Sequence, residues 1–179
     1  MEDISLHILD IAENSVRARA KRIEITVLRD AAKNEISIEL IDDGDGMDAE
    51  TLARIRDPFF TTKRKKTGLG IPFLAQAAEQ ADGSLIVESV PGKGTRVAVR
   101  FSWAHIDRPA LGNMAETILT LIAGHPDIDL VYEERDGGRS FRLDTGEIKR
   151  ELDDVPINTP AALEAIRGML KENAIIIDE

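Results

Sequence analysis

The sequence contains no cysteine, few aromatic side chains and no long apolar segment. The lack of cysteine excludes disulfides, thiolate nucleophiles and cysteine-bound zinc or iron–sulfur clusters, and it fits a reducing cytoplasm. No apolar run approaches the roughly 20 residues that a membrane-spanning helix needs. Residues 1–10 carry acidic rather than basic side chains, so we expect no export signal. These absences predict a cytoplasmic protein with no membrane partner.

Acidic residues outnumber basic residues, 33 to 23, which gives this chain of 179 residues a formal net charge of −10. Such a chain lacks the general basic face that displaces counterions from nucleic acid, so we predict no nucleic-acid partner. The run from Lys63 to Lys66 is a local exception. A basic cluster beside a glycine-rich segment suits a small polyanion.

Hydrophobic periodicity predicts alternating helices and strands. Helical spacing covers residues 4–20, and alternation of apolar and polar residues predicts strands over 23–27 and 36–40. Further helices are predicted over 48–54, 71–81, 113–123 and 160–173, further strands over 85–90 and 95–101, and a hairpin around 136–138. Residues 105–112 lose this periodicity and contain Pro109 and Gly112, so we predict a boundary between residues 1–104 and 105–179.

The first predicted helix carries Asp10, Asn14 and Arg17 on one face. An asparagine oxygen is a suitable ligand for Mg²⁺. Asp10 could accept a proton from an attacking water or hydroxyl, while Arg17 neutralises phosphate charge. The alternative is a polar helix face open to solvent, and short polar patterns alone do not decide between the two.

An aspartate- and glycine-rich loop, residues 42–47, follows the strand over 36–40. Gly44 and Gly46 permit positive φ and close approach of backbone to a ligand. Asp42 can accept a hydrogen bond from an exocyclic amine such as that of adenine. The alternative is a calcium loop, which we reject because no glutamate stands at the twelfth position.

Hydroxyl, ammonium and backbone N–H groups gather between Asp57 and Gly70, just before the helix over 71–81. The N-terminus of a helix is a ready anion site. Taken alone, the basic run could equally be a solvated loop. The order of the motifs along the chain favours the anion site over a solvated loop. The motifs are a helix with Asp10 and Asn14, Asp-x-Gly-x-Gly, Phe-Phe-Thr-Thr-Lys, Gly-Leu-Gly and a late Gly-Lys-Gly-Thr.

This order resembles the nucleotide-binding boxes of the GHKL superfamily, which contains gyrase, the ninety-kilodalton heat-shock chaperones, sensor histidine kinases and MutL. The resemblance covers residues 4–101. Glu13-Asn14-Ser15 looks like MutL, whereas Asp57 to Lys63 and Thr67 to Gly70 look like sensor kinases. The resemblance implies a Bergerat-type α/β sandwich over residues 1–104. Its mixed, mostly antiparallel sheet would carry helices on one face, with a small α+β extension over 105–179.

The resemblance also implies ATP and Mg²⁺ as cofactors, with Asp10 as catalytic residue and Asn14 as metal ligand. Asp42 would bind the adenine amine, Gly44, Gly46 and Met47 would border the base, and Thr95 would support the pocket. Residues 61–70 would form a lid over the phosphates. The ATP-binding set it implies is Asn14, Arg17, Asp42, Gly44, Gly46, Met47, Phe60, Thr61, Thr62, Lys63, Gly68, Leu69, Gly70 and Thr95.

Three features depart from the family pattern. Asp10 stands where the ATPases usually have glutamate, which predicts slow hydrolysis, and Lys66 replaces a glycine common in sensor kinases. The third departure is that we expect no dimerising helix pair with a phosphoacceptor histidine ahead of the first box. The chain as a whole resembles stand-alone histidine-kinase-like ATP-binding proteins of anaerobic bacteria.

Three functions fit these residues. The first is a histidine-kinase-like ATPase or protein kinase that acts in trans on an unidentified protein in signalling or regulation. The second is a slow ATPase switch in which ATP orders the lid and recruits a partner. The third is a nucleotide-sensing module without turnover. The sequence leaves the partner, the phosphoacceptor and the oligomeric state open, and family membership alone does not decide.

Overall fold

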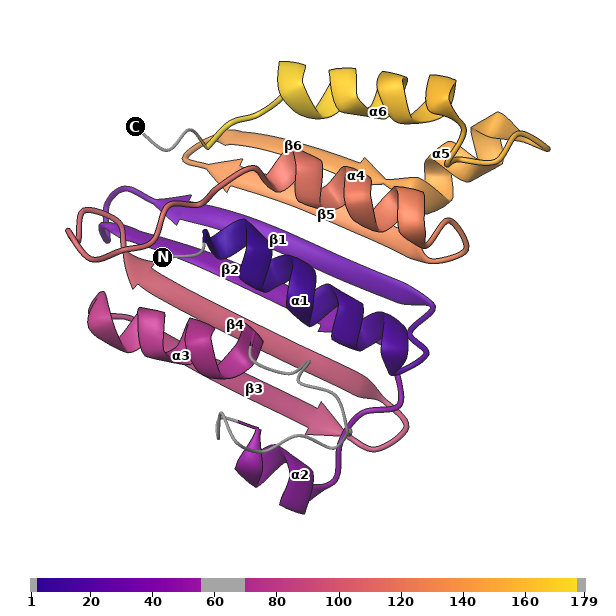
Figure 1. Ribbon diagram of the computed structural model, residues 1–179. Coiled ribbons are helices and arrows are strands. Elements are labelled where there is room, and N and C mark those ends of the chain that lie inside the picture. Colours follow the sequence, from indigo (N-terminus) through magenta and orange to yellow (C-terminus); the bar gives the residue numbers. More distant parts are fainter. Residues whose placement is uncertain (1–2, 56–69, 177–179) are drawn as a thin grey trace.

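The computed structural model describes residues 3–55 and 70–176, which form one mixed sheet covered by helices (Figure 1). The six strands lie in the order β3-β4-β2-β1-β5-β6. All neighbouring strands are antiparallel except β1 and β5, which run parallel. The strands are β1 Arg22–Asp30, β2 Glu35–Asp42, β3 Ser84–Val90, β4 Gly94–Ser102, β5 Asp129–Asp136 and β6 Arg139–Asp144.

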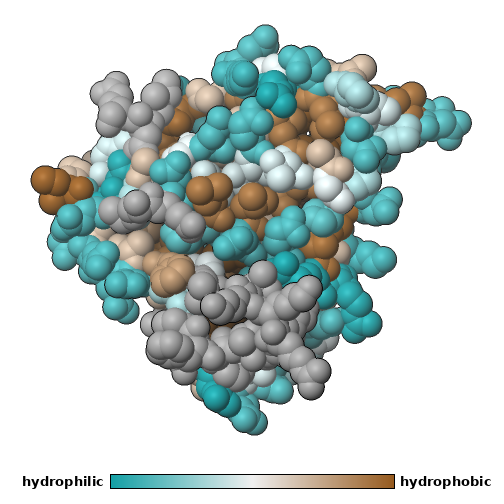
Figure 2. Space-filling view, viewed as in Figure 1, coloured by the Kyte–Doolittle hydropathy of each residue, from teal (hydrophilic) through white to brown (hydrophobic). Residues whose placement is uncertain are grey.

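Four helices lie in a row across one face of this sheet, in the order α3, α1, α4 and α6 (Figure 1). Seen from this side, apolar side chains lie scattered among polar ones (Figure 2). The predicted α/β sandwich with helices on one face is therefore confirmed. The helices are α1 Ile4–Arg17, α2 Ala49–Arg54, α3 Gly70–Gln80, α4 Met114–Gly124, α5 Thr145–Leu152 and α6 Pro160–Glu172.

The core lies between the sheet and the helices. Alternate residues of β1 and β2 are buried, as the period of two predicts, and the apolar stripe of α1 covers them. Each isoleucine buried in this way contributes about 1.5–3 kcal/mol by leaving water. The opposite face of the sheet carries ion pairs, such as those of Arg96 with Glu39 and Glu88. Antiparallel sheets commonly keep one face in solvent, and the pairing of these charges fits such a face.

The predicted extension continues the same sheet. β5 pairs with β1 over eight positions, from Arg22↔Asp129 to Arg29↔Asp136, and β6 then pairs with β5. The division at residue 104 stays a prediction, because a shared sheet does not show whether either part folds alone. No helix of the described residues 3–55 and 70–176 is long and apolar enough to cross a membrane.

Two local details differ from the sequence prediction. The first helix ends at Arg17 rather than at residue 20, because Arg19 adopts a positive φ of 62° that no α-helix continues. Helix α5 is an addition to the predicted elements. It follows β6 without a loop and begins at Thr145. Its N-cap is Asp144, whose carboxylate accepts a hydrogen bond from the Gly146 N–H.

Candidate functional site

Residues of three predicted boxes meet at one end of the sheet. Asp42 ends β2 and Thr95 lies near the start of β4, and the two are direct partners in the antiparallel register. The C-terminal half of α1 passes over the same end, with Asn14 and Ser15 (Figure 1). Local periodicity places each residue at the end of its own element, and the strand pairing brings the ends together.

Asp42 is the buried centre of this end, with 7% of its surface exposed. Its Oδ2 accepts a hydrogen bond of 2.6 Å from the Ser15 hydroxyl. Its Oδ1 accepts bonds from the backbone N–H groups of Gly44 at 2.9 Å and Thr95 at 3.3 Å. A buried carboxylate needs such donors to offset its desolvation. These bonds hold the carboxylate in one orientation.

The loop after β2 packs its backbone against neighbouring backbone, and glycine permits this contact. A Cβ on Gly46, which has φ +68°, would lie 2.1 Å from the Val90 carbonyl oxygen. A Cβ on Gly94, which has φ +99°, would lie 1.8 Å from the Asp42 carbonyl oxygen. From the sequence, we expect glycine at position 46 because it lets the backbone approach a ligand. The structure adds a second reason, which is that the turn between β3 and β4 packs closely against this loop.

The other carboxylates of this loop have separate partners. Asp43 accepts from the backbone N–H groups of Lys21 and Arg22 at 2.7 and 2.9 Å. Asp45 pairs with Arg19 at 2.8 Å. Asp48 caps α2, and the hydrogen bond from the Thr51 N–H lowers its pKa. No group of three or more acidic or histidine side chains within residues 3–55 and 70–176 could hold a metal ion.

Two serines complete the network and were not singled out from the sequence. Ser15 holds Asp42, as described above. Ser89 accepts a hydrogen bond of 2.8 Å from the Met47 N–H, and its hydroxyl lies 2.9 Å from that of Thr95. The network thus ties the loop, β3 and β4 together. Ser15 follows Asn14 in the Glu13-Asn14-Ser15 motif, which is the one signal that could have marked it.

The outer face of α1 carries the remaining predicted residues of that helix. Arg17 donates a hydrogen bond of 2.5 Å to Oδ1 of Asn14. Asp10 is exposed and lies against the first residue of α3, since a Cβ on Gly70 would be 2.9 Å from the Asp10 Cβ. The structure therefore brings Asp10 to the N-terminus of α3, and it pairs Arg17 with Asn14. The predicted residues Phe60, Thr61, Thr62, Lys63, Gly68 and Leu69 lie outside the described residues.

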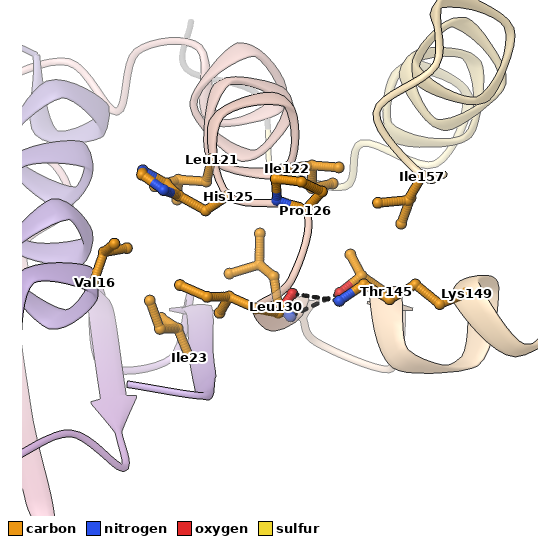
Figure 3. Close-up of a pocket in the computed structure, with 11 residues that line it drawn as sticks. Val16, Ile23, Leu121, Ile122, His125, Pro126, Leu130, Thr145, Lys149 and Ile157 are labelled. Atoms are coloured by element: carbon orange, nitrogen blue, oxygen red, sulfur yellow. Dashed lines mark hydrogen bonds between the residues drawn. The ribbon is translucent and has the colours of Figure 1, made fainter. Parts of the chain in front are cut away.

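A small cavity lies elsewhere, where the extension packs on α1 (Figure 3). Its volume of about 10 Å³ is close to that of one water probe. The Thr145 hydroxyl on its wall accepts from the Leu130 N–H at 2.8 Å, and Lys149 donates to the Ile128 carbonyl oxygen at 2.8 Å. None of the predicted site residues lines it. We interpret it as an imperfection of packing rather than a ligand site.

Residues 2–105 match the family of histidine kinase-, DNA gyrase B-, and HSP90-like ATPases, and the chain belongs to this family. It thus carries an ATPase domain of the histidine-kinase type. The matched segment contains every box on which the sequence resemblance rests. It ends where the predicted extension begins.

The curated relatives include sporulation kinase C of Bacillus subtilis (strain 168), 36% identical over 87 residues, which are 49% of this chain and 20% of that protein. Sensor histidine kinase ZraS of Klebsiella oxytoca is 38% identical over 88 residues, which are 49% of this chain and 19% of that protein. This chain thus matches only about a fifth of the length of either relative.

Structural similarity extends past the matched segment. The crystal structure of the N-terminal domain of a DNA repair protein covers 80% of this chain, and 53% of that chain is covered in return. The TM-score is 0.55 at 17% sequence identity. At this identity the likeness concerns the fold alone. It supports the inclusion of part of the extension in the same architecture.

Proposed function

We propose that the chain binds Mg·ATP at the Asp42 end of the sheet and transfers the γ-phosphoryl group to a partner protein or to water. The observation that carries this proposal is the buried, three-fold hydrogen-bonded Asp42 beside the helix that presents Asn14. The family to which the chain belongs consists of ATPases. The relatives named above are kinases, which favours a protein as phosphoacceptor.

Asp42 is suited to recognise the adenine amine. A carboxylate offers about four lone-pair positions, and three described donors occupy positions on Asp42. The remaining capacity fits one further N–H donor. The amine at the six-position of adenine supplies such a donor, whereas guanine has an oxygen there that a carboxylate repels. We therefore expect selection of ATP over GTP.

Mg²⁺ fits this site only together with the nucleotide. Mg²⁺ commonly takes one or two protein oxygens and completes its shell with phosphate oxygens and waters. Asn14 offers one amide oxygen, and the described residues contain no acidic or histidine cluster that would hold the ion alone. Asn14 would thus hold the ion by its Oδ1. Arg17, which donates to that oxygen here, would turn to the phosphates.

Asp10 is the group proposed to accept the proton. It lies one helical turn before Asn14, is exposed and faces the start of α3. A carboxylate in this place can take the proton of an attacking hydroxyl, imidazole or water as the bond to the γ-phosphorus forms and the bond to the bridging oxygen of the leaving ADP breaks. Aspartate is one methylene shorter than glutamate and reaches less far. This favours a protein acceptor that enters the site deeply rather than a water molecule as the attacking group. A slow ATPase switch remains the second candidate, because the MutL-like Glu13-Asn14-Ser15 favours it.

The test is incubation of the purified chain with Mg²⁺ and γ-labelled ATP, alone and with extract proteins, while free phosphate and labelled protein are followed. Asp10→Asn should abolish both products and leave ATP binding intact. Asn14→Ala and Asp42→Asn should each weaken ATP binding by roughly tenfold or more. The matched control is Asp107→Asn, an exposed aspartate beyond the far end of β4.

Three results discriminate between the candidates. Label retained on protein supports the kinase, and its acid lability separates phosphohistidine from phosphoserine. Free phosphate alone supports the switch. Binding of ATP without either product supports a sensor, and absence of ATP binding contradicts the proposal as a whole.

A further inference from the structure

A second recess lies at the opposite end of the sheet from Asp42. The connection from β4 to α4, the turn between β5 and β6 and Ile175, which follows α6, gather there (Figure 1). Their side chains surround an open hollow of about 680 Å³, within the size range of ligand sites. We call it the arginine hollow. It is lined by Arg29, Trp103, Arg108, Asp136, Arg139 and their neighbours.

The arginine hollow is positive in an acidic chain. Three arginines and one aspartate line it, whereas the whole chain has a net charge of −10. Arg29 and Arg139 both bind the same Oδ2 of Asp136, at 3.2 and 3.0 Å. One carboxylate thus serves two guanidinium groups and neutralises one of their two charges. The side chain of Arg139 is 66% exposed and presents its charge to solvent.

Two of the three arginines are held in place by contacts with Trp103. The guanidinium carbons of Arg29 and Arg108 lie 4.6 and 4.4 Å from the centroid of the Trp103 ring, within the range of cation–π contacts. Arg108 also donates to the carbonyl oxygens of Trp103 and Pro109 at 2.8 and 2.9 Å. Such groups lose less freedom when a ligand binds than arginines on a free surface.

The rim of the hollow carries an apolar side chain in open solvent. Ile106 is 94% exposed, the highest value among the large apolar residues of the described part. A single exposed apolar residue needs no explanation by itself, but this one lies beside fixed arginines and a tryptophan. Arginine and tryptophan are enriched at the energetic centres of protein interfaces.

We propose that the arginine hollow binds an acidic, partly apolar segment of a partner protein. Its carboxylates would bind Arg29 and Arg139 as charge-assisted pairs, and an apolar side chain would cover Ile106. A free small anion would leave Ile106 unused. Nucleic acid would meet a chain that is acidic outside this hollow. The arginine hollow shares no residue with the proposed ATP site, so the two proposals can be tested separately.

Trp103 gives a direct readout, because it is the only tryptophan in the sequence. The full chain is titrated with a short blocked peptide of alternating glutamate and leucine while Trp103 fluorescence is followed. We expect a saturable change that weakens with added salt. A peptide with glutamine in place of glutamate should not bind. Circular dichroism checks that each variant is folded.

Variants assign the response to the hollow. Arg139→Gln should weaken peptide binding about tenfold, because it removes a charged donor, and Ile106→Ser should weaken it about fivefold by loss of apolar contact. Arg135→Gln is the matched control, since Arg135 lies on the adjoining strand β5 and pairs with Glu133 at 2.7 Å. It should bind the peptide as the unaltered chain does.

Four results would overturn the proposal. These are no saturable response, equal binding of the glutamine peptide, and equal loss of binding in Arg135→Gln and Arg139→Gln. The fourth is an inorganic phosphate response as strong as that of the peptide, with Ile106→Ser unchanged, which would indicate a small-anion site. ATP binding should be unchanged in all three variants, so that failure here leaves the proposed nucleotide site untouched.

Discussion

The Ser15 hydroxyl lies 2.6 Å from Oδ2 of Asp42, and this hydrogen bond joins α1 to the end of β2 across 27 positions of sequence. Both side chains are buried. Asn14, the proposed magnesium ligand, is the residue next to Ser15 on the same helix. The bond therefore fixes the distance between the part of the site proposed for adenine and the part proposed for phosphate.

Replacing Ser15 by alanine should loosen this connection. The buried Asp42 carboxylate would lose one of its three described donors, and hydrogen bonds to charged groups contribute about 1.5–3 kcal/mol. We expect a loss of that size in the free energy of unfolding and roughly tenfold weaker ATP binding. Urea denaturation and calorimetric titration measure the two effects. Ser37→Ala, on the solvent face of β2, is the control and should change neither.

Alanine substitutions of two glycines, one in the turn between β3 and β4 and one at the start of β4, can be compared directly. Gly92 and Gly94 both have positive φ, of 76° and 99°. A Cβ on Gly92 meets no atom within 4 Å, whereas one on Gly94 would lie 1.8 Å from the Asp42 carbonyl oxygen. Gly92→Ala should therefore cost about 1 kcal/mol of stability from backbone strain alone.

Gly94→Ala should cost roughly 3 kcal/mol or more, because backbone must move. That movement would also displace Asp42 and weaken ATP binding, which Gly92→Ala should leave intact. Thermal unfolding with and without Mg·ATP measures both quantities. Equal stabilisation of the two variants by Mg·ATP would contradict the proposed role of Asp42.

Tyr132 should make the chain sensitive to alkali. Burial, followed by the nearby Glu134 carboxylate to which its hydroxyl donates at 2.6 Å, raises its pKa well above the ordinary value. The folded state therefore favours the protonated phenol. Its contribution to stability is complete below the pKa of the unfolded chain, about 10, and is lost as the pH rises from there toward the folded pKa.

The measurement is the denaturation midpoint between neutral pH and about pH 11. Tyr132→Phe should lower stability near neutral pH by about 1–2 kcal/mol through loss of the hydrogen bond, and it should flatten the alkaline decline. Tyr132 is the only tyrosine in the sequence, so tyrosinate absorbance reports its ionisation directly. Ionisation in the folded chain near pH 10 would contradict this prediction.

Glu134 should anchor the segment that follows α6. Its buried Oε2 accepts hydrogen bonds from the backbone N–H groups of Ile175 and Ile176, at 2.8 and 3.1 Å. Glu134→Gln would weaken these charge-assisted bonds, and its amide NH2 group would face either the two backbone donors or the Tyr132 hydroxyl. The exchange of the Ile175 and Ile176 amide hydrogens should then accelerate. Glu133→Gln, on the opposite face of the same strand, should leave their exchange unchanged.

Local signals predicted most of the fold and several residues of the candidate site. Alternation in β1 and β2 and the apolar stripe of α1 are periodic over short stretches, so the sequence alone predicted these elements. The bond between Ser15 and Asp42 depends on how α1 crosses the sheet, which no local period encodes. The pairing of β5 beside β1 was missed for the same reason, because more than a hundred positions separate Arg22 from its partner Asp129.

The glycines show a different limit of sequence reasoning. The pattern Asp-x-Gly-x-Gly indicates that small residues are required but not what approaches them. At Gly46 and Gly94 the neighbouring atoms are backbone carbonyl oxygens of Val90 and Asp42. These contacts form only after β4 has paired with β2. Ligand binding and backbone packing can thus both require glycine at these positions, and only the structure shows which of the two reasons applies.

The parallel pairing of β5 with β1 has a consequence for any shortened form of this chain. A version that stops near residue 105 would keep every residue of the matched family segment, yet it would leave β1 as a bare sheet margin. Unsatisfied amide and carbonyl groups along that margin would offer a template for another chain. We expect such a fragment to self-associate and to precipitate at concentrations at which the intact chain stays dispersed. Residues 106–179, about two fifths of the sequence, thus shield this edge of the sheet from other chains.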